Sequence, residues 1–386
     1  MKNRLLAFFL VTVMAVSMVA CGKESAEKAE TKTEKTKTDA KPVEYDVDEY
    51  VTLGDYKGVE VTLTGTYDFT EEGLDEYVSK TIADASVYVE DTSKTEVEED
   101  SIINVDYVGS QDGVAFDGGS AENQMIDVAG NCAAGGTGGY IDGFTSGLAG
   151  HSVGEEVAYE VTFPEQYGNA DLAGQTVIFT FQINYVAKAI ESKADLTDDI
   201  VKENFGSDTV DEYIDSLTEQ YKSKLESDYE NDVQTSVLNT IINNSKVSKV
   251  PEELVQARVD MYLNLLEMQC KQYNTTTKDY LDSMGQDYDE YVENVKSNLN
   301  DSLTEELILE AIAKKEGMEV DAEGYEKFIA NLVASTGSKD EDAFYEVYTV
   351  DNYDGKRYFR QQYLIQKAVQ FCVDNAVVTK GEAEEN

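Results

Sequence analysis

Aromatic side chains at the edges of turns are the residues of this sequence whose type and spacing suggest chemistry. They recur between Val97 and Val186, in the blocks D-Y-V-G, F-D-G-G, Y-I-D-G-F, F-P-E-Q-Y-G and F-T-F-Q-I. The chemistry they offer is apolar contact and hydrogen bonding by phenol groups. Short alternating apolar runs separated by Gly and Asp-Gly turns predict that a compact antiparallel β-domain positions them.

Histidine and cysteine chemistry finds little support in the sequence. His151 is the only histidine, and none of Cys21, Cys132, Cys270 and Cys372 forms a C-x-x-C pair. The pattern therefore disfavours a metal site or a His-dependent hydrolase. We predict no cofactor and no metal, and the three later cysteines are interpreted as small apolar side chains whose redox state the sequence leaves open.

The ordered aromatic blocks resemble the FKBP-type peptidyl-prolyl isomerase domain, in the version found in bacterial trigger factor. The resemblance spans about ninety residues and includes G-H-S-V-G-E-E, which places His151 in a turn. Residues 50–100 resemble the connection by which trigger factor enters this domain, and residues 195–380 resemble its helical C-terminal region. The resemblance implies an α+β fold: an FKBP-like curved antiparallel β-sheet around a short helix, then an all-α trigger-factor-type chaperone domain.

The resemblance also implies an apolar pocket between sheet and helix. Carried over by motif, its residues are Tyr107, Phe116, Asp117, Tyr140, Ile141, Phe144, Tyr167 and Phe179. Phe144 stands at the pocket floor, where many FKBP domains have a tryptophan. Tyr167 can donate a hydrogen bond to a substrate carbonyl, and Asp117 can orient another phenol or hold the pocket wall.

Such a pocket has a physical route to isomerisation. Amide resonance holds an X-Pro bond behind a barrier of roughly 18–20 kcal/mol, and the twisted transition state has lost that conjugation. Since the twisted amide is less polar than the planar one, a water-poor aromatic pocket can favour it without a nucleophile, metal or general base.

Several proposed pocket residues also have an ordinary structural explanation, although core packing explains Tyr167, in a turn after Pro164, less well. Phe116 and Phe179 lie on expected strands, where an aromatic ring usually belongs to the core. Asp117 precedes two glycines and has the position of a turn residue. Only the joint occurrence of these residues in order favours the pocket.

One segment departs from the family pattern. After Asp127 the chain reads V-A-G-N-C-A-A-G-G-T-G-G, which is longer and richer in glycine than the family's pattern. We predict a strand through Met125, Ile126 and Val128, then an inserted loop over residues 130–139 that borders the pocket and brings Cys132 close to it. The loop completes no dinucleotide-binding or phosphate-binding frame.

Residues 1–21 have the pattern of a lipoprotein signal peptide. Lys2 and Arg4 precede an apolar run, Leu5 to Val19, of signal-peptide length. Ala20-Cys21-Gly22 resembles the bacterial lipobox, in which cleavage leaves a lipid-bearing cysteine at the N-terminus. We therefore predict lipid on Cys21 and an extracytoplasmic location, anchored to the bacterial cell membrane. A plain secretory signal with an incidental cysteine is the alternative.

Residues 22–43 are predicted to be a disordered tether. Lys23 to Lys41 contains no large apolar side chain, so it cannot offset the entropy of ordering. Residues 44–96 then suggest a first strand and a connecting helix, with Thr70 as the helix N-cap. The FKBP-type domain is predicted over residues 97–190.

The region 191–380 is predicted to form helical chaperone arms. Apolar residues recur every fourth position from Tyr213 to Ile241, which indicates a long helix whose apolar stripe winds slowly around it. Further helices are expected from Pro251, over 287–316 before Gly317, and over 321–336, 340–349 and 355–375. The resemblance implies that these arms hold unfolded chains; the alternative is that their stripes only pack against one another.

Charge excludes one class of partner. The formal net charge of −46 repels nucleic-acid phosphates, so we expect no nucleic acid. The basic hairpin with a G-F-R-x-G-K-x-P-type signature, by which trigger factor docks on the ribosome, has no counterpart, so we also expect no ribosome binding.

Three functions remain in view. The first is a peptidyl-prolyl cis-trans isomerase and folding chaperone for exported proteins, with unfolded or partly folded exported polypeptides as partners. The second is a catalytically weak or inactive holdase chaperone with a vestigial FKBP pocket. The third is a surface adhesin or solute-binding lipoprotein that borrows the fold.

Overall fold

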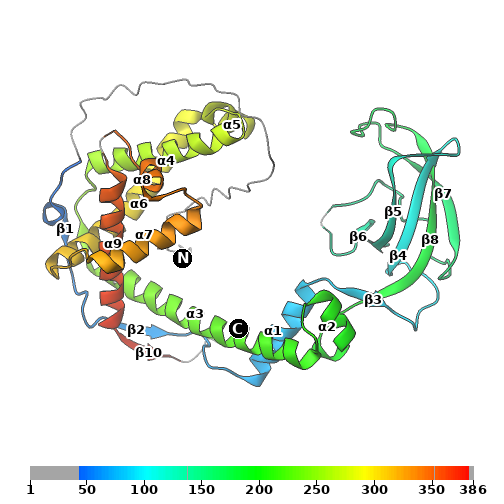
Figure 1. Ribbon diagram of the computed structural model, residues 1–386, viewed down its shortest axis with the longest axis horizontal. Helices are drawn as coiled ribbons and strands as arrows, with labels where there is room; N and C mark the ends of the chain where they lie inside the picture. Colours follow the sequence, from blue (N-terminus) through cyan, green and yellow to red (C-terminus); the bar gives the residue numbers. More distant parts are fainter. Residues whose placement is uncertain (1–42, 137, 352, 382–386) are drawn as a thin grey trace. The chain divides into compact units, whose positions relative to one another are not determined.

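The computed structural model describes residues 43–136, 138–351 and 353–381. The predicted signal peptide, Cys21 and residues 22–42 of the tether lie outside the described residues. The chain divides into two compact units. Among the described residues, those of 67–226 form what we call the sheet unit, and those of 43–66 together with those of 227–381 form the helical unit (Figure 1). The domain boundaries expected from the sequence stay a prediction.

An antiparallel sheet dominates the sheet unit. Its strands run in the order β3 (Tyr88–Glu90), β8 (Thr176–Ala189), β4 (Ile102–Gln111), β5 (Val114–Asp127) and β6 (Cys132–Ala133), and β7 (Glu156–Thr162) also pairs with β8. β4 and β5 are joined by Asp112 and Gly113, both with positive φ, as a two-residue hairpin turn requires. Register shifts in β4 bend its pairing with both neighbours. The predicted antiparallel β-domain is confirmed.

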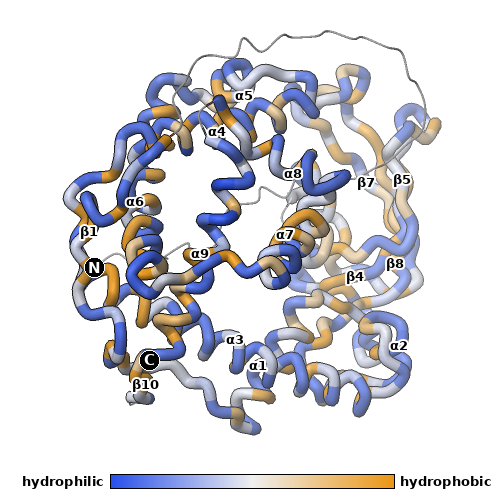
Figure 2. Tube along the Cα trace, turned by 60° about the vertical axis from the view of Figure 1, so that its left-hand side comes forward, coloured by the Kyte–Doolittle hydropathy of each residue, from blue (hydrophilic) through white to orange (hydrophobic). Residues whose placement is uncertain are grey.

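Alternation of apolar and polar residues builds the core of this sheet. Along β8 the side chains of Val177, Phe179, Phe181 and Ile183 are buried, whereas Ile178 between them is exposed. Figure 2 shows that both hydrophobic and hydrophilic residues occur along the strands of this sheet. One face of the sheet is therefore available to line a pocket.

The short helix implied by the resemblance is a run of turns in this chain. Between residues 141 and 149, backbone N–H groups bond three residues back, from Phe144 to Ile141 and from Leu148 to Thr145. Gly143 adopts a left-handed φ of +84°, which interrupts a helical backbone. The α+β fold is unchanged by this local difference.

Helix α1 (Glu71–Asp84) begins as predicted, because the Thr70 hydroxyl accepts a hydrogen bond from the Gly73 N–H at 3.0 Å. It packs with α2 (Asp198–Asn204) and the first half of α3 (Val210–Asn244). Leu217 and Leu225 of α3 share a buried cluster with Val78 of α1. The unit boundary falls inside α3, and Val237 and Ile241 are buried beyond it. The apolar stripe is therefore buried on both sides of the unit boundary.

The helical unit contains most of the remaining helices. They are α4 (Glu252–Gln272), α5 (Thr277–Ser283), α6 (Tyr288–Lys315), α7 (Ala322–Thr336), α8 (Glu341–Val347) and α9 (Gly355–Asp374). Asp287 caps α6 at its start, and Gly317 follows its end with φ +63°. The helices predicted from periodicity are confirmed, although Pro251 is the N-cap of α4 rather than part of its first turn. Helices α2 and α5, of seven residues each, were not predicted.

The start of the described chain belongs to the core of the helical unit. Val43 is only 2% exposed, and β1 (Val51–Thr52) pairs with β9 (Lys246–Val247). β2 (Glu60–Leu63) pairs in parallel with β10 (Val377–Lys380), so segments from the two ends of the described chain lie side by side. No local pattern in the sequence predicts this pairing.

A buried charge pair joins three helices of this unit. Arg258 of α4, 3% exposed, donates to Glu306 of α6 at 2.7 Å, and its guanidinium lies 4.1 Å from the ring centroid of Tyr358 on α9. Gln362 of α9 donates to the same carboxylate at 3.1 Å. These contacts compensate the cost of burying the arginine.

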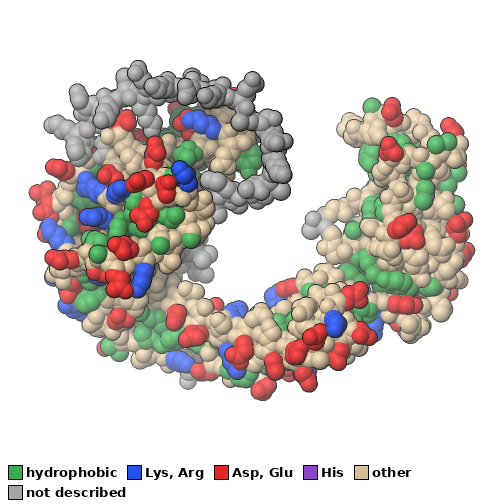
Figure 3. Space-filling view, in the orientation of Figure 1, with side chains coloured by type: hydrophobic (Ala, Val, Ile, Leu, Met, Phe, Trp, Pro, Cys, Tyr) green, Lys and Arg blue, Asp and Glu red, His purple; other side chains and the backbone are tan. Residues whose placement is uncertain are grey.

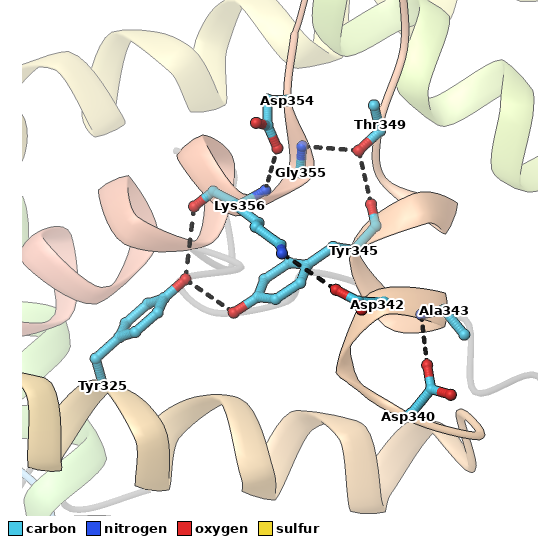
Figure 4. Close-up of polar contacts among 9 residues, drawn as sticks. All are labelled: Tyr325, Asp340, Asp342, Ala343, Tyr345, Thr349, Asp354, Gly355 and Lys356. Atoms are coloured by element: carbon cyan, nitrogen blue, oxygen red, sulfur yellow. Dashed lines mark hydrogen bonds and ion pairs between the residues drawn. The ribbon is translucent and has the colours of Figure 1, made fainter.

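Phenol and carboxylate contacts join α7, α8 and α9 (Figure 4). The hydroxyls of Tyr325 and Tyr345 lie 3.1 Å apart, and Lys356 forms an ion pair with Asp342 at 3.1 Å. The Gly355 N–H donates to Thr349 at 3.0 Å. A Cβ atom at Gly355 would lie 2.3 Å from the Tyr345 carbonyl oxygen, so the close approach of α8 and α9 requires glycine there.

The surface is strongly acidic. Figure 3 shows aspartate and glutamate side chains spread over the drawn face of both units. In the described part of the chain, no helix has the length and apolar character needed to cross a bilayer.

Candidate active site

A pocket of about 320 Å³ opens in the sheet unit. All eight site residues predicted from the sequence line it: Tyr107, Phe116, Asp117, Tyr140, Ile141, Phe144, Tyr167 and Phe179. The structure adds Gly118, Gly119, Gly139, Phe163, Asn169 and Leu172 to the lining. Phe163 is the first residue of the F-P-E-Q-Y block that also contains Tyr167. Its closeness to Tyr167 in sequence could have indicated that it lines the pocket. The catalytic role of the eight residues stays a prediction.

Five parts of the sheet unit supply these side chains. Tyr107 comes from β4, Phe116 and Asp117 from β5, and Phe179 from β8. The turns after residue 139 supply Tyr140, Ile141 and Phe144, and Tyr167 lies in the loop after β7. Residues far apart in sequence therefore meet because β4 lies between β5 and β8.

Phe144 is fixed at the floor of the pocket. Its ring is 3% exposed, and its centroid lies 5.1 Å from Tyr107 and 4.9 Å from Phe179, both in edge-to-face geometry. Its backbone carbonyl accepts a hydrogen bond from the Tyr159 hydroxyl. The neighbouring rings fix the Phe144 side chain, and the hydrogen bond from Tyr159 fixes its backbone.

Two glycines make room for the wall residue Phe116. A Cβ atom at Gly109 would lie 2.4 Å from the Phe116 ring, and one at Gly119 would lie 2.3 Å from it. The Phe116 ring meets Phe179 edge to face with centroids 5.9 Å apart. The aromatic wall therefore depends on close approach between ring and backbone, which only glycine permits.

Several polar groups of the pocket have no hydrogen-bond partner in the described part of the chain, although Asn169 accepts from the Asp171 N–H. No hydrogen bond is made there by the hydroxyls of Tyr107, Tyr140 and Tyr167, by the Asp117 carboxylate or by the backbone N–H of Ile141. Asp117 therefore makes no hydrogen bond to a phenol among these residues, and its part in holding the pocket wall stays a prediction. The three hydroxyls and the N–H remain available as donors to a ligand carbonyl.

Burial favours the protonated phenols. It raises the pKa of Tyr107 above the ordinary value of a tyrosine. Burial also raises the pKa of Tyr140, and the nearby Tyr107 and Cys132 add to that effect. Both side chains therefore keep their O–H donors at neutral pH.

The inserted loop borders the pocket without filling it. Of residues 130–139, only Gly139 lines the pocket among those described. The predicted strand is confirmed at Met125 and Ile126 in β5, whereas Val128 lies just beyond it. β6 pairs Cys132 with Asp127, and a further bridge joins Cys132 to Gly139. Cys132 is a free, half-buried thiol that does not line the pocket.

His151 lies outside this site, in a turn as predicted. Its carbonyl accepts the Val97 N–H at 2.9 Å, and its Nδ1 lies 2.9 Å from the Glu155 carboxylate. Within the described ranges, no group of three or more His, Cys, Asp or Glu residues could hold a metal ion. The residues of the pocket can bind an apolar ring and donate hydrogen bonds.

Substitution of Gly109 by alanine tests the aromatic wall. Because the added methyl group would collide with Phe116 and Phe179, we expect Gly109→Ala to push the Phe116 ring into the pocket. The dissociation constant of a short X-Pro peptide, measured by calorimetry, should rise by about tenfold or more. Gly168→Ala is the matched control, since nothing lies within 4 Å of its added Cβ atom. Equal affinity in the two variants would contradict this role of Gly109.

Comparison with known proteins identifies both parts of the chain. The family described as FKBP-type peptidyl-prolyl cis-trans isomerase matches residues 93–184, and the family described as bacterial trigger factor protein C-terminus matches residues 209–374. These ranges contain the pocket and most of the helical unit, respectively.

Whole-chain relatives agree with these two matches. Trigger factor from Halothermothrix orenii is 30% identical over 325 residues, which cover 84% of this chain and 72% of that protein. Trigger factor from Clostridioides difficile is 29% identical over 330 residues, with the same two shares. A solved structure from work on "Promiscuous Substrate Recognition in Folding and Assembly Activities of the Trigger Factor Chaperone" aligns with 84% of this chain and 72% of its own, at 15% identity and a TM-score of 0.40. With an FKBP-type domain and a trigger factor C-terminus in one chain, the protein belongs to the trigger factor family.

Proposed function

We propose that this protein is a peptidyl-prolyl cis-trans isomerase and folding chaperone that acts on exported polypeptides outside the cytoplasmic membrane. The observation that carries the isomerase proposal is the convergence of the eight predicted residues on one aromatic pocket. The family supports a folding chaperone with this domain. The holdase alternative requires a damaged pocket, and the inserted loop contributes only Gly139 to the lining described.

In the proposed mechanism the substrate proline ring lies against Phe144 and Phe179 and displaces water from the pocket. Rotation about the X-Pro bond removes amide conjugation, so the carbonyl loses dipole as it approaches the transition state. Desolvation in the pocket then costs the twisted amide less than the planar amide. No covalent intermediate forms.

The unpartnered donors give the pocket a second contribution. A hydroxyl of Tyr107, Tyr140 or Tyr167, or the N–H of Ile141, can bond a substrate carbonyl and hold it while the bond rotates. Phenols need no change of protonation for this purpose. The rate should therefore vary little with pH near neutrality.

Isosteric tyrosine substitutions test this mechanism. Tyr167→Phe removes one donor and keeps the ring, and we expect kcat/KM on an X-Pro peptide to fall about tenfold if the hydroxyl bonds the carbonyl in the transition state. NMR exchange measures this rate without a coupling protease. Tyr185→Phe, on β8 but outside the pocket lining, is the control and should be unaffected.

A double variant tests whether these residues form the isomerase site. Phe179→Ala removes a buried ring from the pocket wall, so its thermal unfolding must be measured beside its activity. Turnover unchanged in a folded Tyr167→Phe, Phe179→Ala double variant would reject these residues as the site. Absence of turnover in the unmodified protein would favour the holdase.

Client binding is proposed for one exposed patch of the helical unit. At the end of α4, in α5 and at the start of α6 the chain exposes five large apolar side chains, which we call the tip patch: Met268, Tyr273, Tyr280, Met284 and Tyr288. Tyr273 is 75% exposed and Met284 57% exposed. Flexible methionine and amphipathic tyrosine side chains suit contact with many different unfolded sequences.

Polar substitutions test the tip patch. We expect Tyr273→Ser with Met284→Ser to weaken suppression of client aggregation, measured by light scattering, by about threefold to tenfold. The unfolding transition should not change, because both side chains are largely exposed. Val114→Ser, which removes an equally exposed apolar side chain from β5, is the control. Equal loss in the control would show that general surface hydrophobicity, not this patch, is responsible.

Membrane anchoring through Cys21 completes the proposal. It is supported by the order of basic residues, apolar run and Ala20-Cys21-Gly22 in the sequence. In bacteria grown with a labelled fatty acid, we expect label on the unmodified protein and none on Cys21→Ser. Cys132→Ser should keep the label. Label that persists on Cys21→Ser would refute anchoring at this residue.

A further inference from the structure

We propose that Asn131, in the inserted loop, is a positioning residue for the pocket. Its side chain fixes the turn of residues 140–145, which supplies Tyr140, Ile141 and Phe144 to the lining. Asn131 itself does not line the pocket among the residues described. The catalytic consequence rests on the isomerase function proposed above.

The Asn131 side chain spans this turn from its beginning to its end. Its Nδ2 group donates to the carbonyl oxygens of Tyr140 at 3.2 Å and of Ile141 at 3.1 Å. Its Oδ1 atom accepts from the backbone N–H of Thr145 at 3.1 Å. Phe144, the floor residue, lies between these attachment points in sequence.

The partners determine the orientation of the amide. Backbone carbonyls only accept hydrogen bonds and a backbone N–H only donates, so Nδ2 must face Tyr140 and Ile141 while Oδ1 faces Thr145. Both amide hydrogens are used. A carboxylate of the same shape could not replace this group, because it would place an acceptor oxygen against two carbonyl oxygens.

The backbone of Asn131 adds a further attachment. Its carbonyl oxygen accepts the Tyr140 N–H at 2.7 Å, and its φ of +47° lies in the left-handed region that asparagine tolerates better than most residues. The Thr145 hydroxyl donates to the Val128 carbonyl at 2.9 Å, which ties the turn to the end of β5. The insertion therefore braces the pocket turn from outside.

The turn needs this brace because it is not a regular helix. Its own backbone bonds run from Phe144 to Ile141 and from Ser146 to Gly143, and no backbone bond within the described residues serves the Thr145 N–H. The Thr145 N–H and the Tyr140 carbonyl thus depend on Asn131 for their hydrogen bonds there. Loss of that side chain frees the segment that carries the pocket floor.

Asn131→Asp in the full chain is the decisive variant. At pH 7.5 the carboxylate repels the two carbonyls, and we expect kcat/KM for an X-Pro peptide, measured by NMR exchange, to fall about 10²-fold. Near pH 5, burial among carbonyls favours the protonated acid, whose O–H donates and whose C=O accepts as the amide does. Activity relative to the unmodified protein should then recover by about tenfold or more.

Other titratable groups lie on the segments that Asn131 joins, namely Asp127, Cys132, Tyr140 and Asp142. Activity of the unmodified protein, measured at each pH, corrects for any effect of their titration. A merely structural role predicts that activity and thermal stability fall together at pH 7.5 and recover together near pH 5. Rescue in a variant that stays folded at both pH values is therefore the signature of positioning.

Glycine substitutions supply a matched pair. Asn131→Gly keeps the left-handed backbone and removes the side chain, so we expect a loss of about tenfold in kcat/KM. Asn123→Gly makes the same change at φ +53° on β5, at a residue whose N–H donates to Asp106 and which does not line the pocket. It should leave kcat/KM unchanged.

Two further measurements separate failure of this inference from failure of the proposed function. If the unmodified protein shows no turnover, calorimetry of the same peptide reports whether the pocket binds it. Amide hydrogen exchange at Thr145 reports on the turn with or without ligand, and Asn131→Gly should speed it about tenfold or more. Slow exchange at Thr145 and unchanged peptide affinity in Asn131→Gly and Asn131→Asp would overturn the inference.

Discussion

The pocket depends on one dense aromatic contact, that of the Phe144 ring with Tyr107, Phe179 and Phe181. Those three rings come from β4 and β8. The rings lie on the same face of the sheet only if these strands pair in the observed register, including its shift between Asn104 and Val105. Every other lining residue takes its place around this contact. Gly109 and Gly119 admit Phe116 beside it, and Tyr159 holds the Phe144 backbone beneath it.

The inserted loop changes how the floor is supported. In place of a short helix with its own hydrogen bonds, this chain has a run of turns in which Asn131 bonds the Tyr140 carbonyl and the Thr145 N–H, and the Thr145 hydroxyl donates to the Val128 carbonyl. A glycine-rich insertion beside a pocket is expected to loosen its wall. In this segment, however, glycines lie before and after Asn131, whose side chain makes several hydrogen bonds. Composition alone therefore did not predict the effect of the insertion on the pocket.

Local signals in the sequence predicted much of this fold. Thr70 and Asp287 predicted the starts of two helices, and Gly317 predicted the end of one. The four-residue spacing of apolar residues from Tyr213 to Ile241 predicted the long helix. These signals can be read from the sequence because each depends only on residues that are neighbours in the chain. The pocket set required the family motifs, because no single aromatic residue distinguishes core from site. The sequence could not predict the parallel pairing of β2 with β10 or the contacts of Asn131, because both depend on partners that only the tertiary structure brings together.

The division of the chain at residues 66 and 227 also sets an order of folding during synthesis. The sheet unit is a continuous stretch, so its contacts can close as soon as residue 226 has emerged. Residues 43–66 must wait for later partners: Val43 belongs to a buried cluster that includes residues from Val250 to Phe359, and β2 pairs with β10 at residues 377–380. A nascent copy of this chaperone thus carries its own exposed apolar segment for most of the time that its synthesis takes.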